Sequence, residues 1–162
     1  MANKVYVNPE TAITFKASGG DVVFTNTSVA NAAGRISAQW DRGSGAKPAR
    51  YVWRAHTKAG AALAVGNALE IYFATSDGTD VDGNQGTSDA AFSAADKRRN
   101  LQFVGLVVAD STTNGEVQIA SGVVEIYTRY VSVVWWNGLG QTLSGTAGDH
   151  TFTLTPVPDE IQ

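Results

Sequence analysis

The chain has 162 residues, carries a net charge of −3 and contains no cysteine. This length suits a single domain, spanning residues 1–162, that buries about two thirds of its unfolded surface. The charge argues against a general nucleic-acid binder, the lack of cysteine excludes disulfides and cysteine-based zinc sites, and no apolar run approaches the roughly 20 residues of a membrane span.

The composition indicates an all-β protein. Gly, Ala, Ser, Thr and Val are abundant, whereas Lys and Glu are few and Met occurs once. Such a balance is typical of short strands separated by many turns rather than of helices. The absence of cysteine fits assembly inside the cell, and the first residues lack the apolar core of a secretory signal.

Short apolar or alternating segments predict strands in the first half of the chain. We expect them at residues 5–7, 13–15, 21–26, 35–41, 50–57 and 68–75. Within the fourth of these, Ile36, Ala38 and Trp40 alternate with polar residues and are predicted to share one buried face. Side chains predicted to share a face in the last two strands are Tyr51, Trp53, Ala55 and Thr57, and then Leu69, Ile71 and Phe73. Residues 1–20 are interpreted as an N-terminal arm or edge strands.

Residues 76–100 form the longest segment without strand character, and we interpret them as a long surface loop. Its acidic residues come first and a basic cluster comes last: Asp77, Asp80, Asp82 and Asp89, then Lys97, Arg98 and Arg99. Long insertions in compact domains are usually functional or mobile. The basic cluster is a candidate contact for an acidic neighbour or a phosphate, and its alternative interpretation is a solvated charge run.

Further strands are predicted at residues 101–109, 116–119, 123–137 and 150–155. In the first of these, Gly105 indicates a bulge or a close approach of another group. Residues 123–137 are the densest β-branched and aromatic run, which we interpret as a central strand pair ended by a turn at Asn137-Gly138.

Both faces of the second half of that run are largely apolar. We therefore expect a second sheet to cover one face, and a neighbouring subunit, a loop or an arm to cover the other. Tyr130, Trp135 and Trp136 are accordingly candidate subunit-interface residues.

The C-terminal residues 156–162 are predicted to be an extended tail, because Pro156 and Pro158 lack backbone donors and disfavour helix. With Val157, these prolines are candidate interface residues of a C-terminal arm. Together, about eight short strands separated by turns predict a β-sandwich, specifically a jelly roll, with extended N- and C-terminal arms.

No catalytic constellation is apparent, and we expect neither enzymatic activity nor a cofactor. Residues 77–84, DGTDVDGN, resemble a calcium loop in composition, but the spacing departs from an EF-hand because Gln85 and Ala91 replace the required glycine and glutamate. His56 and His150 lack metal-ligand spacing. The acidic stretch is therefore expected to be a solvated loop rather than a metal site.

The four tryptophans allow two interpretations. They are core or subunit-interface residues, or they form a platform on which sugar rings stack, since flat aromatic surfaces bind the apolar faces of sugars. The residues are Trp40, Trp53, Trp135 and Trp136.

Four segments carry a resemblance to a known family: RYVWRAHTK, EIYFATSDGT, GVVEIYTRYVSVVWWNGLG and TLTPVPDEIQ. Together they resemble the capsid decoration, or cement, proteins of tailed bacteriophages. The resemblance implies a β-sandwich on the outside of an expanded icosahedral shell, commonly a trimer, which bridges capsomers of the major capsid protein. It also implies assembly in the bacterial cytoplasm and a final location on the virion surface. It transfers no functional residue position by position, but it makes the capsid a second candidate partner for Tyr130, Trp135 and Trp136.

The physical requirements of such a role are a rigid scaffold, extended arms and many weak contacts multiplied by avidity. The predicted arms and the two-faced apolar strand meet these requirements. The alternative is a carbohydrate- or receptor-binding sandwich of a phage tail or fibre, in which a tryptophan would contact the ligand.

Overall fold

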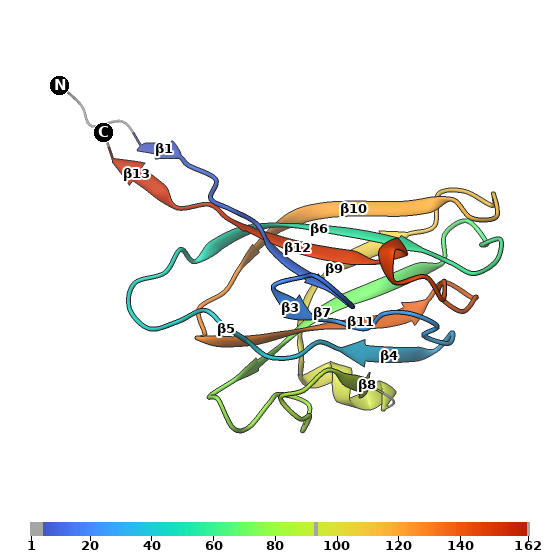
Figure 1. Ribbon diagram of the computed structural model, residues 1–162, viewed down its shortest axis with the longest axis horizontal. Helices are drawn as coiled ribbons and strands as arrows, with labels where there is room; N and C mark the ends of the chain where they lie inside the picture. Colours follow the sequence, from blue (N-terminus) through green and yellow to red (C-terminus); the bar gives the residue numbers. More distant parts are fainter. Residues whose placement is uncertain (1–4, 93, 162) are drawn as a thin grey trace.

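The computed structural model describes residues 5–92 and 94–161, and nearly all of its regular structure is β (Figure 1). In chain order the elements are β1 (Val5–Val7), β2 (Ile13–Lys16), β3 (Val22–Val23), β4 (Ala33–Ile36), β5 (Trp40–Asp41), β6 (Arg50–Lys58), β7 (Ala68–Ser76), β8 (Ala90–Phe92), the 3-10 helix η1 (Ala95–Asn100), β9 (Gln102–Val108), β10 (Val117–Glu125), β11 (Tyr130–Gly138), η2 (Ala147–Asp149), β12 (Thr151–Pro156) and β13 (Asp159–Ile161).

Two sheets pack face to face, which confirms the predicted all-β sandwich (Figure 1). One, the β6 sheet, has the order β10-β6-β12-β2-β3, and the other, the β11 sheet, has the order β8-β4-β11-β7-β9, with β5 also paired to β11. The chain passes repeatedly from one sheet to the other. This alternation is compatible with the jelly roll, which stays a prediction. More strands are present than the eight or so expected, because several span only two to four residues.

The main core lies between the sheets and contains the faces predicted from alternation. Along β6, Tyr51 and Trp53 are buried whereas Val52 is exposed, and along β7, Leu69 and Ile71 are completely buried. Phe152 of β12 meets these side chains from the β6 sheet. The period-two pattern of these strands therefore gave the correct inward face.

Both faces of β11 are buried, as predicted. Val133 and Trp135 point into the main core, whereas Val134 and Trp136 enter a second apolar cluster on the outside of the β11 sheet. That outer cluster is completed by residues of neighbouring strands and of the segment after β7: Ile36, Ala74, Val81, Phe92 and Leu101. The cover over the outer face of β11 is thus a segment of the same chain.

Several expectations about strands need correction. The run at residues 123–137 contains two strands, but β10 and β11 belong to different sheets and do not pair with each other. Residues 76–100 contain regular structure that was not predicted. Ala90–Phe92 form a strand that pairs with β4, and residues 95–100 form a 3-10 helix. Residues 21–26 contribute only Val22–Val23.

The expected strand at residues 35–41 is broken into β4 and β5. Both pair with β11, but Ser37 interrupts the ladder: its hydroxyl accepts the Val133 N–H at 2.9 Å while its own N–H donates to the Val133 carbonyl at 2.8 Å. The irregularity reverses the side-chain alternation. Ile36 therefore lies in the outer cluster while Trp40 packs against the main core, so the predicted shared face is wrong.

The expected buried strand at residues 101–109 is an edge strand. Its pairing with β7 is irregular between Ile71 and Tyr72, next to Gly105, so the predicted bulge is confirmed. Phe103 and Val108 are 55% and 48% exposed. The sequence predicted a fully buried strand because apolar residues occupy both of its faces. However, β9 is the last strand of the β11 sheet, and only one of its faces is covered.

Candidate attachment surfaces

The two ends of the chain meet in a ribbon, which we call the arm sheet. β1 and β13 pair antiparallel, with Val5 opposite Ile161 and Val7 opposite Asp159. Figure 1 shows this pair projecting beyond one end of the sandwich. An isolated two-stranded ribbon is marginally stable in water, and its outer edges carry backbone groups that a partner strand can pair with. The predicted arms therefore form one joint structure rather than two separate tails.

The base of the arm sheet is anchored to the sandwich. Pro156 is the last residue of β12 and pairs with Tyr51, and the Val157 N–H donates to the Arg50 carbonyl at 3.0 Å. Pro156 and Val157 are buried, and Pro158 is half-buried. Two of the three predicted C-terminal interface residues thus hold the ribbon in place. On the N-terminal side, β2 belongs to the sandwich, so the projecting arm is shorter than residues 1–20.

Trp135 and Trp136 are interior residues, which corrects their placement on a subunit or capsid interface. They are 1% and 5% exposed in the isolated chain, so neither presents a surface to a partner. Tyr130, at the start of β11, is half-buried. The Arg129 guanidinium lies over its ring, 4.8 Å from the centroid, and a Cβ built on Gly78 would lie 3.0 Å from that ring.

The basic cluster lies on η1, and its members differ in role. The Arg98 guanidinium donates to the Glu70 carboxylate at 2.7 Å and lies 4.5 Å above the Trp136 ring, so it covers the outer cluster. Lys97 donates to the Asn84 carbonyl at 3.3 Å. Arg99 forms an ion pair with the neighbouring Asp96 on η1 at 3.5 Å, and its side chain is 81% exposed. The three cations therefore have different partners within the chain, and their contact with an acidic neighbour or a phosphate stays a prediction.

The tryptophans do not form a surface platform for sugars. Trp53 is 4% exposed and stacks on Phe152 at a centroid distance of 6.3 Å. Trp40 is half-buried, and Phe15 and Tyr51 contact it edge to face at 6.1 and 6.0 Å. Since Trp135 and Trp136 are also buried, core packing accounts for all four.

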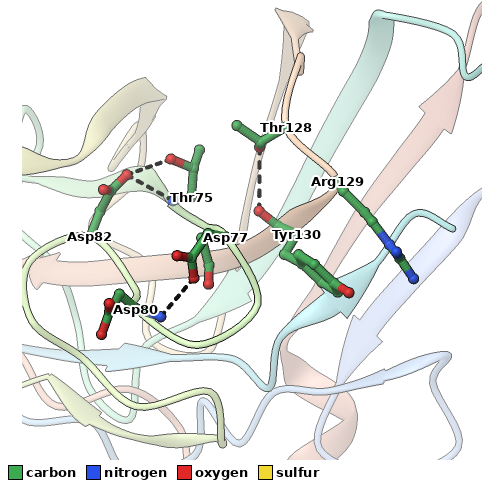
Figure 2. A pocket seen from close by; sticks show the side chains of 8 residues that line it. Thr75, Asp77, Asp80, Asp82, Thr128, Arg129 and Tyr130 are labelled. Atoms are coloured by element: carbon green, nitrogen blue, oxygen red, sulfur yellow. Dashed lines mark hydrogen bonds between the residues drawn. The ribbon is translucent and has the colours of Figure 1, made fainter. Parts of the chain in front are cut away.

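The acidic loop, residues 77–82, borders an open cleft of about 670 Å³ at the end of β7 and the start of β11 (Figure 2). Hydrogen bonds hold two of its three carboxylates, those of Asp77 and Asp82. Asp82 accepts hydrogen bonds from the Thr75 N–H and hydroxyl, at 3.0 and 2.5 Å. Asp77 accepts from the N–H groups of Thr79 and Asp80, and these bonds lower the pKa of Asp77.

This arrangement does not gather metal ligands. Among the described residues, no group of three or more His, Cys, Asp or Glu side chains is placed to hold an ion. His150 is buried, with its ring nitrogens 3.0 Å from the Thr57 hydroxyl and 2.9 Å from the Ser144 carbonyl, and burial lowers its pKa. His150 is thus a hydrogen-bonded interior residue.

Sequence reasoning missed the outer face of the β6 sheet. Three apolar side chains of β6 and β10 are exposed there, Val52 by 40%, Ile119 by 49% and Val123 by 62%. Arg54 lies among them, opposite Ser121 of β10 and Thr153 of β12. The outward residues of β12 are all threonine: Thr151, Thr153 and Thr155. The alternation of β6 and β10 does contain this signal, since apolar residues at outward positions mark an unusually apolar outer face.

Comparison of the sequence with protein-family models and with curated proteins gives no match. Within the described residues, no helix has the length and apolarity to span a membrane.

Proposed function

We propose that this protein is a structural component of a bacteriophage virion. It binds the outside of the capsid as a homo-oligomer, in our proposal a trimer, and stabilises the shell by bridging neighbouring subunits of the major capsid protein. The role needs no catalytic group, nucleic acid or membrane. It extends the resemblance of this sequence to capsid decoration proteins.

The observation that carries the proposal is the arm sheet beyond the end of a two-layered sandwich (Figure 1). A cementing protein needs a rigid body that fixes the geometry of attachment and an extended element that reaches a neighbour. The short ladder between β1 and β13, three residue pairs long, has little stability of its own and gains from a partner strand.

Avidity explains how so small an element can hold a protein on a shell. A second contact made by a linked copy becomes intramolecular, so several weak strand contacts in an oligomer sum to firm attachment. The buried base at Pro156 and Val157 keeps the ribbon in a defined direction, which lowers the entropic cost of docking.

The test compares the full chain with a chain that ends at Pro158. This truncation removes β13 while keeping the buried anchor, and thermal unfolding should show an unchanged sandwich. Both chains are mixed with purified expanded capsids from which the protein has been removed, and bound copies are counted by mass spectrometry.

We expect the full chain to bind in a fixed ratio to the major shell protein and the truncated chain to lose occupancy. Equal occupancy of the two chains would exclude the arm sheet as the attachment element. Failure of the full chain to bind, or its absence from purified particles, would overturn the virion role itself.

A further inference from the structure

The outer face of the β6 sheet combines exposed apolar side chains with unpaired cations. Arg54 is exposed at its centre, and Lys16 of β2 lies on the same face beside Val23, which is 51% exposed. Neither cation has an ion-pair partner among the described residues. Glu125, at the end of β10, is the one carboxylate on the strands of this face in the described part of the chain. Exposed apolar side chains around an unpaired arginine are a composition typical of protein-binding surfaces.

The opposite charge is exposed elsewhere on the same molecule. Asp77, Asp80 and Asp82 are exposed in the acidic loop, and no ion pair joins them to a cation within the described residues. Hydrogen bonds from Thr75 orient the Asp82 carboxylate, and one from the Asp80 N–H orients that of Asp77. Two of the three negative charges are therefore held in a defined direction, which lowers the entropic cost of binding a partner.

Within one copy these two surfaces cannot meet. The acidic loop follows β7, in the β11 sheet, whereas the cations lie on the outside of the β6 sheet, on the other side of the sandwich (Figure 1). The positive face and the acidic loop are thus a complementary pair that only two different copies can bring together. Each copy carries one of each, so every copy can use both surfaces in contacts with other copies.

We propose that the outer face of the β6 sheet, centred on Arg54, binds the acidic loop of a second copy of this chain. Val52 and Val123, which lie opposite each other on β6 and β10, become covered beside the charged contact. This contact rests on the self-association that is part of the proposed function, and it identifies the surfaces that associate. Its formation requires no capsid partner.

The experiment reverses each charge separately and then both together. Association of the full chain is measured by sedimentation velocity over a range of concentrations, at low and high salt. Arg54→Glu and Asp80→Arg should each weaken self-association roughly tenfold or more, because like charges are then opposed. The double variant should restore it. Wild-type association should also weaken as salt screens the contact.

Arg99→Glu is the matched control, since it makes the same charge change on a cation that is 81% exposed and lies on η1, away from this face. It should leave self-association unchanged. The proposal is overturned if the wild type is monomeric throughout, if Arg99→Glu weakens association as much as Arg54→Glu, or if the double variant is not restored. A wild-type monomer that still occupies capsids would overturn this contact and leave the virion role standing.

Discussion

Two glycines on different strands make room for one buried tryptophan. The Trp53 indole stacks on Phe152 and is 4% exposed. A Cβ added at Gly105 of β9 would lie 2.5 Å from Trp53 Cζ2, and one added at Gly122 of β10 would lie 2.7 Å from Trp53 Nε1. Both contacts are far shorter than normal van der Waals distances, so the ring has no space to move away from either strand.

We therefore expect Gly105→Ala to destabilise the protein through overpacking. Forcing an extra carbon into a packed core typically costs about 1–3 kcal/mol. Replacing glycine also reduces the entropy of the unfolded chain, which stabilises by about 0.4–1 kcal/mol. Gly86→Ala is the matched control, because a Cβ there meets nothing within 4 Å and provides the entropic gain alone. The difference between the two variants isolates the overpacking, again about 1–3 kcal/mol.

Urea unfolding, analysed with the same m-value for both variants, measures this difference in the free energy of unfolding. Each kcal/mol corresponds to a change in Tm of roughly 2–4 °C for a domain of this size. Combining Gly105→Ala with Trp53→Phe should cost less than the sum of the two single changes, since the smaller ring relieves the clash. Equal stability of Gly105→Ala and Gly86→Ala would refute the argument, and so would strict additivity in the double variant.

Three further predictions concern the outer cluster, an ion pair and the acidic loop. Trp136→Ala should lower the free energy of unfolding by about 3–5 kcal/mol in urea titration, because it removes the largest buried ring of the outer cluster; a loss below 1 kcal/mol would contradict that packing. Burial raises the pKa of Asp89, but hydrogen bonds from Arg35 at 2.9 and 2.6 Å help to bring it below its ordinary value of 3.8. The stabilisation from ionised Asp89 is thus fully present above pH 3.8 and is lost as pH falls through the lowered pKa. Asp89→Asn should therefore lower the free energy of unfolding by about 1–3 kcal/mol at neutral pH and reduce the loss of stability at acid pH. An unchanged loss of stability at acid pH would refute this. Asp82→Ala should lower the free energy of unfolding by about 1 kcal/mol, because it removes the hydrogen bonds from Thr75. Addition of calcium or of a chelator should leave the Tm of the wild type unchanged, and a rise in Tm with calcium would reveal a metal site.

The sequence by itself determined the local character of most strands. Alternation with a period of two is a property of neighbouring residues, so the inward faces of β6, β7 and β12 were predictable without any knowledge of their partners. The same reasoning indicated that both faces of β11 are buried and that Gly105 is closely approached. The all-β sandwich follows from the number and spacing of such segments.

Only the tertiary structure decided what covers each face. Trp136 looks like an interface residue in the sequence, but the segment that buries it, around Phe92 and Leu101, comes from another part of the chain. The break at Ser37 depends on its bonds to Val133, and the arm sheet depends on pairing between the two ends of the chain. These outcomes rest on contacts between residues far apart in sequence, where local patterns carry no information about distance. For the same reason, the sequence predicted two separate arms, whereas folding joins them into one ribbon.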